Sequence, residues 1–191
     1  MWAVLVVSHT GQLMEQTALT GSRIGARFAS GYARTLLHVV SIPAVIAMAV
    51  IVFLLALWRG SRRRALWAAG TIAATNASAQ LLKHTLLWRP DFGLSQRWDA
   101  ANTLPSGHTA VAASTAVALV LVVGARWRSL TAWVGALLAA AMGYSTLVCQ
   151  WHRPGDVMAA LLLAVGWGAV AVACGAWAND EPAPGGRTGP D

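Results

Sequence analysis

Long, nearly uncharged apolar stretches separate short clusters of charge along this 191-residue chain. Hydrophobic residues make up 57% of the sequence and charged residues only 11%, whereas charged residues form about a quarter of an ordinary soluble domain. A helix needs about 20 mostly apolar residues to cross a bilayer. Several of the uncharged stretches reach this length, so the sequence predicts an all-α, multi-pass transmembrane helical bundle.

We expect five spans in this bundle. They cover residues 36–58, 65–87, 106–125, 130–148 and 157–177. The opening segment MWAVLVV is apolar but too short to cross, so it is either an interfacial foot or the remnant of a truncated sixth span. Residues 1–34 are expected to form an amphipathic lead, loop-like over residues 8–34, and residues 35–177 the membrane domain. The tail, 178–191, is rich in proline and glycine and is expected to be disordered.

The basic residues indicate how the bundle lies in the membrane. The net charge of +7 points to anionic lipid rather than to nucleic acid, because no basic stretch is interleaved with aromatic residues. Arginines gather in the loop after the first span and in the loop after the third. They are Arg59, Arg62, Arg63, Arg64, Arg126 and Arg128. Five crossings place both loops on one side, which the positive-inside rule makes cytoplasmic; Arg23, Arg27 and Arg34 oppose this assignment but are more dispersed.

Three polar blocks interrupt the apolar pattern at the other membrane face. They are KHTLLWRP at 83–90, PSGH at 105–108 and STLVCQWHRPGD at 145–156. By parity all three lie at the ends of spans on the extracytoplasmic side of the cytoplasmic membrane. Ionisable residues at membrane depth usually mark a functional site.

The cations and the helix start in these blocks are suited to binding phosphate. Lys83 and Arg89 supply positive charge for phosphate oxygens, lysine as a point charge and arginine as a fork. Ser106 and Gly107 open a helix whose free amides and dipole favour an anion. Gly107 has no side chain to keep a ligand from that backbone. These four residues are our candidate phosphate ligands.

The histidines provide groups for proton transfer and nucleophilic attack. His108 and His152 can act as acid and nucleophile. Asp156 could hold the second histidine in one tautomer, as the third member of a catalytic triad does. Few carboxylates lie near this face, so we expect no metal cage.

Each of these residues also has a purely structural interpretation. Ser106 could only cap its helix, Asp156 could only be a first-turn acid behind Pro154, and Lys83 could snorkel from a span end. These separate explanations do not account for the gathering of all the polar residues at one face. Elsewhere, Asn76 and Gln80 are expected to make hydrogen bonds between helices. Glu15 has no role in this interpretation.

Taken together, the three blocks resemble those of the type-2 phosphatidic acid phosphatase superfamily, integral-membrane lipid phosphatases whose core fold is shared with vanadium haloperoxidases. The resemblance covers residues 83–156. It implies a double displacement in which His152 attacks phosphorus and forms a phosphohistidine, oriented by Asp156. His108 would protonate the leaving oxygen and later help to activate water.

The resemblance also implies which groups hold the substrate. The phosphoryl oxygens would be held by Lys83, Arg89, Ser106 and the Gly107 amide, with Ser145 and Arg153 as further candidate contacts. The implied reaction needs no metal and no cofactor. The implied substrate is a lipid phosphate or an isoprenoid diphosphate whose tail stays in the bilayer, and the sequence leaves the oligomeric state open.

Two departures from the superfamily pattern bear on activity. Five residues separate Lys83 from Arg89, where six are usual, and Thr146 stands where the superfamily carries an arginine. Arg153 and Arg97 are candidates to replace that arginine. The loss motivates an alternative function, a catalytically weak or silent scaffold that binds lipid phosphate. A transporter or a haloperoxidase-like enzyme fits the sequence less well.

Overall fold

The computed structural model describes residues 1–22, 26, 31–35, 37, 42–58, 62–94 and 102–178. Their regular structure is helical throughout, which confirms the all-α prediction. A π-helical turn η1 (Ala3–Val7) and α1 (His9–Gly21) come first. The other elements are α3 (Ile42–Trp58), α4 (Arg62–Leu81), the π-helical turn η2 (Leu82–Leu86), α5 (Gly107–Val122), α6 (Ala125–Val148) and α7 (Pro154–Ala173). Arg97, His38 and the predicted tail from residue 179 lie outside the described residues.

Each of the five expected spans overlaps one long helix, but only two of these helices are long and apolar enough to cross a membrane by length and composition, so the five crossings stay a prediction. These two are α6 and α7, whereas α5 is apolar but has only 16 residues. α4 begins with three arginines, and α3 has 17 residues. α7 begins at Pro154, earlier than expected, because proline fits the first turn of a helix.

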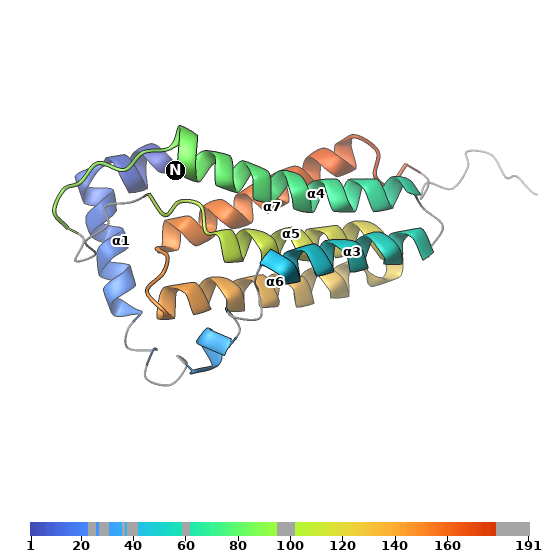
Figure 1. The fold of residues 1–191 in the computed structure, drawn as a ribbon, viewed down its shortest axis with the longest axis horizontal. Helices are drawn as coiled ribbons and strands as arrows, with labels where there is room; N and C mark the ends of the chain where they lie inside the picture. The colour runs from blue at the N-terminus through green and yellow to red at the C-terminus, as the bar shows by residue number, and fades with distance from the viewer. Residues whose placement is uncertain are drawn as a thin grey trace, which may run out of the picture.

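α5 lies at the centre of the bundle and packs against α3, α4, α6 and α7. The five helices run side by side along the long axis of the molecule (Figure 1). Thr109, Ala110 and Ala118 of α5 are completely buried. Small side chains such as these let neighbouring helices approach closely.

Glycines on α6 and α7 allow close contacts with α5. A Cβ atom on Gly135 would lie 2.6 Å from the Cβ of Ala116, and one on Gly168 would collide with Val117. Ala164, Gly168 and Ala171, three members of a small-residue stripe visible in the sequence, are buried along α7. The fourth member, Gly175, lies beyond the end of α7 and has a left-handed backbone with φ +84°. The stripe therefore serves helix packing only over the length of α7.

The outer surface of α6 and α7 is strongly apolar. Large hydrophobic side chains with more than half of their surface exposed include Leu130, Trp133, Leu137, Leu138, Leu162 and Val165. Soluble monomers rarely expose contiguous apolar patches of this kind. This surface is suited to contact with lipid.

The two arginine clusters occupy the same end of the bundle. Arg64 at the start of α4 and Arg128 at the start of α6 are close enough to interact electrostatically. Arg63 donates a hydrogen bond to the carbonyl of Cys174 beyond the end of α7, at 3.0 Å. The opposite end holds the starts of α5 and α7 and the end of α6 (Figure 1).

The amino-terminal lead contains a helix, so its expected loop-like character is wrong for residues 9–21. Ser8 caps this helix, because its hydroxyl accepts from the amide of Gly11 at 3.0 Å. One face of α1 buries Gln12, Glu15 and Leu19, which recur at the three- and four-residue spacing of a helix face. α1 lies across the end of the bundle that carries the starts of α5 and α7 (Figure 1).

We expect Gly168→Leu to destabilise the protein and Gly166→Leu to have a much smaller effect. The first change overpacks the α5–α7 contact, which costs about 1–3 kcal/mol, whereas a Cβ on Gly166 meets nothing within 4 Å. Thermal unfolding in detergent, followed by circular dichroism, measures both variants. Equal midpoints for the two would contradict the packing described above.

Candidate active site

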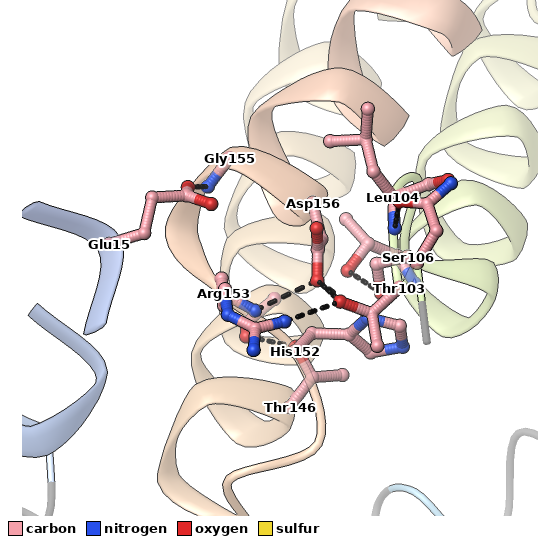
Figure 2. A network of polar contacts seen from close by, with 12 residues as sticks. Glu15, Thr103, Leu104, Ser106, Thr146, His152, Arg153, Gly155 and Asp156 are labelled. Atoms are coloured by element: carbon pink, nitrogen blue, oxygen red, sulfur yellow. Dashed lines mark hydrogen bonds and ion pairs between the residues drawn. The ribbon is translucent and has the colours of Figure 1, made fainter. Parts of the chain in front are cut away.

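The side chains of His152 and Asp156 meet at the start of α7 (Figure 2). His152 Nδ1 lies 3.1 Å from Asp156 Oδ2, and the two residues are only 9% and 1% exposed. An ionised carboxylate accepts hydrogen bonds but cannot donate them. Nδ1 therefore donates to Asp156, which leaves the lone pair of Nε2 available for reaction.

The same oxygen of Asp156 accepts two further hydrogen bonds. Thr103 Oγ1 donates to it at 2.7 Å and the backbone N–H of Arg153 at 2.9 Å. Asp156 also lies in the first turn of α7, where the helix dipole favours a negative charge. Asp156 is therefore both a first-turn acid of α7 and the hydrogen-bond partner of His152, as the two interpretations of the sequence proposed.

The turn between α6 and α7 sets the position of His152. The amides of Trp151 and His152 both donate to the carbonyl of Thr146, at 2.9 and 3.3 Å, just as α6 ends. Gln150 takes a left-handed backbone with φ 59°, which is uncommon for a residue with a side chain. Pro154 then starts α7, so His152 lies directly before the new helix.

The start of α5 is bonded to the start of α7. The Ser106 amide donates to the carbonyl of Asp156 at 2.9 Å. Ser106 is fully buried, and its hydroxyl accepts from the amide of Thr109 at 3.4 Å and from the Thr109 hydroxyl at 3.0 Å. The capping interpretation of Ser106 is confirmed, and its contact with phosphate stays a prediction. A Cβ on Gly107 would have only Gln80 nearby, at 3.9 Å, so the space beside this glycine is open.

His108 and Lys83 lie near the same buried pair. The half-buried His108 is close enough to His152 and to Lys83 for their charges to interact. Its ring centroid lies 5.6 Å from that of Trp151. Lys83, half-buried on η2, interacts in the same way with Asp156. Side chains from α5, η2 and the start of α7 thus gather at one end of the bundle.

A π-helical turn accompanies the shortened first block. η2 includes Lys83 and follows α4 directly. A π turn contains one residue more than an α turn and so changes the register of the chain beyond it. Lys83 and Arg89 both come within electrostatic reach of Asp156. The guanidinium of Arg89 also donates to the Gln12 side-chain oxygen at 2.8 Å.

Ser145 and Thr146 are bonded within α6. The hydroxyl of Ser145 donates to the carbonyl of Ala141 at 2.8 Å, and that of Thr146 to the carbonyl of Gly143 at 2.7 Å. The predicted phosphate contact of Ser145 therefore stays a prediction. Arg153 is 2% exposed.

The guanidinium of Arg153 lies against the acid–histidine pair. Its Nη1 donates to Thr103 Oγ1 at 3.0 Å (Figure 2). Thr103 thus joins the guanidinium of Arg153 to the carboxylate of Asp156. Thr103 is a site residue that the sequence motifs do not include, and its position two residues before PSGH is the available signal.

Glu15 is a second site residue to which the sequence motifs give no role. Its Oε1 accepts a hydrogen bond from the Gly155 amide at 2.6 Å (Figure 2). Burial, with a contribution from the carboxylate of Asp156, raises the pKa of Glu15 to about 7, although the Gly155 amide, Arg153 and Arg89 act in the opposite direction. The sequence signal is an acid that shares a helix face with Gln12 in an amphipathic segment.

The charges of this end of the bundle suit an anionic ligand. Lys83, Arg89 and Arg153 bring positive charge to the two carboxylates, Asp156 and Glu15. Arginine and lysine side chains bind phosphate through charge-assisted hydrogen bonds. No group of three or more histidine, cysteine or acidic side chains in the described part of the chain could hold a metal ion.

A histidine–carboxylate pair surrounded by cations at one end of a helical bundle is suited to binding an anionic group and reacting with it. A family model described as the PAP2 superfamily matches residues 64–180, more than half of the chain, and the chain belongs to this superfamily. The superfamily is a phosphatase family, and the resemblance noted in the sequence is confirmed. Comparisons with curated proteins and with solved structures gave no match. The matched region runs from the third residue of α4 to beyond the end of α7 and excludes α1 and α3.

We expect Thr103→Val to lower phosphate release about 10-fold or more and Thr103→Ser to retain most of it. Valine keeps the shape but removes the hydroxyl that bonds Asp156 and Arg153, and a hydrogen bond to a charged group contributes about 1.5–3 kcal/mol. Turnover of a phosphate ester by each variant provides the measurement. Similar activity in the valine variant and the wild type would show that the Thr103 bridge is dispensable.

Proposed function

We propose that this protein hydrolyses a lipid phosphate or an isoprenoid diphosphate through a phosphohistidine at His152, without a metal ion. The observation that carries the proposal is the 3.1 Å contact between His152 Nδ1 and Asp156 Oδ2. It makes Nε2 the nucleophilic nitrogen, as the orienting acid of a triad does. Membership of a phosphatase superfamily supports the reaction class.

The proposed reaction has two displacements. His152 Nε2 attacks phosphorus, the N–P bond forms, and the bond from phosphorus to the leaving oxygen breaks. His108 gives its proton to that oxygen. In the second step His108 takes a proton from water, whose oxygen attacks phosphorus while the N–P bond breaks. Phosphate leaves, and both histidines return to their starting states.

The phosphoryl group would be held mainly by positive charge and by backbone. In phosphoryl transfer, positioning and charge stabilisation contribute most of the catalysis. Lys83 and Arg89 would bind the phosphoryl oxygens together with the Gly107 amide, beside which the structure leaves open space. Arg153 would add a third cation from the start of α7. Ser106 and Ser145, whose hydroxyls already have partners, would contribute less.

We further propose that α3, α4 with η2, α5, α6 and α7 all cross the cytoplasmic membrane. The end with Arg64 and Arg128 would face the cytoplasm, in keeping with the positive-inside rule. The candidate site, at the opposite end, would then face the extracytoplasmic side. The exposed apolar surface of α6 and α7 supports this placement. A lipid substrate could keep its tail in the bilayer while its phosphate enters the site.

One observation favours a second candidate function. Thr146, at the position where the superfamily carries an arginine, is fully buried and bonded within its own helix. A site that lacks this arginine could bind lipid phosphate as a scaffold without turnover. The two functions differ in whether a covalent phosphoenzyme forms.

We expect His152→Ala to lower phosphate release by at least about 10,000-fold, because removal of a nucleophile leaves only the catalysis provided by binding. His84→Ala is the matched control, since His84 is exposed and contacts Gln80. Acid quenching with labelled substrate should trap phosphate on the wild type and on the His84 variant but not on the His152 variant. Turnover that survives in His152→Ala, or that EDTA abolishes, would overturn the proposed mechanism. Lipid binding without turnover would favour the scaffold.

A further inference from the structure

The amino-terminal segment 1–22 lies outside the region matched to the superfamily but covers the candidate site. It contacts the segment that follows η2 at several points. Trp2 donates from Nε1 to the carbonyl of Trp88 at 3.1 Å, and the two rings meet edge to face. The His9 ring meets that of Phe92 with centroids 5.5 Å apart. The segment carrying Arg89 is therefore held by side chains from the amino terminus.

Gln12 makes the contact closest to the proposed chemistry. It is 2% exposed, and its Nε2 donates to the carbonyls of Val6 and Pro90 at 2.7 and 2.8 Å. These two bonds fix its amide group. Its Oε1 accepts from Arg89 at 2.8 Å. One buried amide thus links η1, α1 and the guanidinium of a candidate phosphate ligand.

Glu15, one turn further along α1, reaches the other half of the site. Its carboxylate accepts a hydrogen bond from the amide of Gly155, which lies between His152 and Asp156 in the sequence. The approach requires a glycine, because a Cβ at position 155 would collide with the Glu15 carboxylate. Glu15 is 4% exposed, and its Oε2 has no hydrogen-bond partner among the described residues. Burying an acid lowers the stability of a protein unless its charge is well paired. The position of Glu15 beside the turn that carries His152 therefore indicates that it has a function there.

The far end of α1 is bonded to the turn between α6 and α7. Gln150 donates from Nε2 to the carbonyl of Leu19 at 2.9 Å and to the hydroxyl of Ser22 at 2.8 Å. Gln150 is the residue with the left-handed backbone two positions before His152. α1 therefore bridges two parts of the chain that are about 60 residues apart in the sequence, the Arg89 segment and the His152 turn.

We infer that residues 1–22 form a brace that completes the active site, with Gln12 positioning the Arg89 guanidinium and Glu15 positioning the turn that carries His152 and Asp156. The inference rests on the proposed phosphatase function. Neither residue would touch the substrate, so both are positioning residues. Their effects on phosphate binding should pass through the groups they hold.

The first test is a double-mutant cycle between Gln12→Met and Arg89→Ala in the full-length protein. Methionine has nearly the volume of glutamine but offers Arg89 no oxygen. We expect Gln12→Met to weaken the binding of inorganic phosphate about 10-fold in the otherwise wild-type protein. In the Arg89→Ala background the same substitution should weaken binding less than about 2-fold, because the effects of two substitutions that remove one contact are not additive. The rise of the unfolding midpoint with phosphate concentration measures binding.

Gln16→Met is the matched control, since Gln16 lies on the same helix and its side-chain oxygen has no hydrogen-bond partner among the described residues. It should leave phosphate binding unchanged. If Gln12→Met weakened phosphate binding equally with and without Arg89, or weakened it in neither case, the inference would be overturned. The proposed function would still stand in that case, provided that the wild type releases phosphate from a lipid. A wild type that neither binds phosphate nor releases it from a lipid would instead overturn the proposed function and the inference with it.

A second measurement on Glu15 does not depend on the Gln12 variant folding. Glu15→Gln keeps an oxygen for the Gly155 amide but cannot ionise. In the folded protein Glu15, which faces Asp156, Arg153 and Arg89, holds its proton to about pH 7, compared with an ordinary pKa of 4.5. The folded state thus binds more protons between these values, so the Glu15 contribution to stability is lost as the pH rises through 7.

The unfolding midpoint of Glu15→Gln should therefore rise relative to the wild type by several degrees between pH 5 and pH 8. Parallel thermal unfolding of the two proteins in detergent across this range gives the difference directly. A difference that stays constant with pH would mean that Glu15 is not buried against Gly155 and Asp156. That result would overturn the Glu15 half of the brace.

Discussion

A backbone hydrogen bond from the Ser106 amide to the Asp156 carbonyl joins the starts of α5 and α7. Two helix amino termini come together at this seam, and each brings the positive end of a helix dipole. His108 is on one side of the seam, and the pair of His152 and Asp156 is on the other. Thr103 crosses it from the segment before α5 to the carboxylate of Asp156. If the seam opened, the proposed acid and the proposed nucleophile would separate.

The two carboxylates of the site differ in their hydrogen-bond partners and in how readily each keeps a negative charge. Asp156 Oδ2 has three hydrogen-bond donors around it, which suits a charge that must persist in order to orient His152. Glu15 has one donor, the Gly155 amide, and its pKa is raised to about 7 by burial and by its neighbour Asp156. A neutral Glu15 can hold the turn without competing with Asp156 for the nearby cations. The site thus keeps its positive excess for an anionic ligand.

The sequence was sufficient to predict the parts of the site that depend on local chemistry. Ser106 is a helix cap and Pro154 begins a helix, each for a reason that a few neighbouring residues contain. The common location of the three blocks followed from span parity alone. The fold of α1 did not follow, because an amphipathic pattern tells which face is buried but not which partner buries it.

Other features depended on tertiary contacts that no local pattern encodes. The left-handed Gln150 is held by bonds to α1, and glutamine has no special preference for that conformation. Thr103 was unremarkable as one of many hydroxyl residues beside a turn. The π-helical turn η2 was equally hidden, because a π turn takes up an extra residue whereas the first block is one residue short, so the spacing gave no signal for it.

The replacement of an arginine by Thr146 fits the way this chain distributes its cations. Thr146 is completely buried and its hydroxyl is bonded to Gly143, so α6 contributes no charge from this position. Arg153 brings a guanidinium to Thr103, and through it to Asp156, from the residue that precedes α7. Arg89 in turn is tied to α1 by Gln12. Under the proposed function, Arg153 at the start of α7 would replace the arginine that the superfamily carries in α6. The contact of Gln12 with Arg89 would in the same way give α1 a role in phosphate binding as well as in the fold.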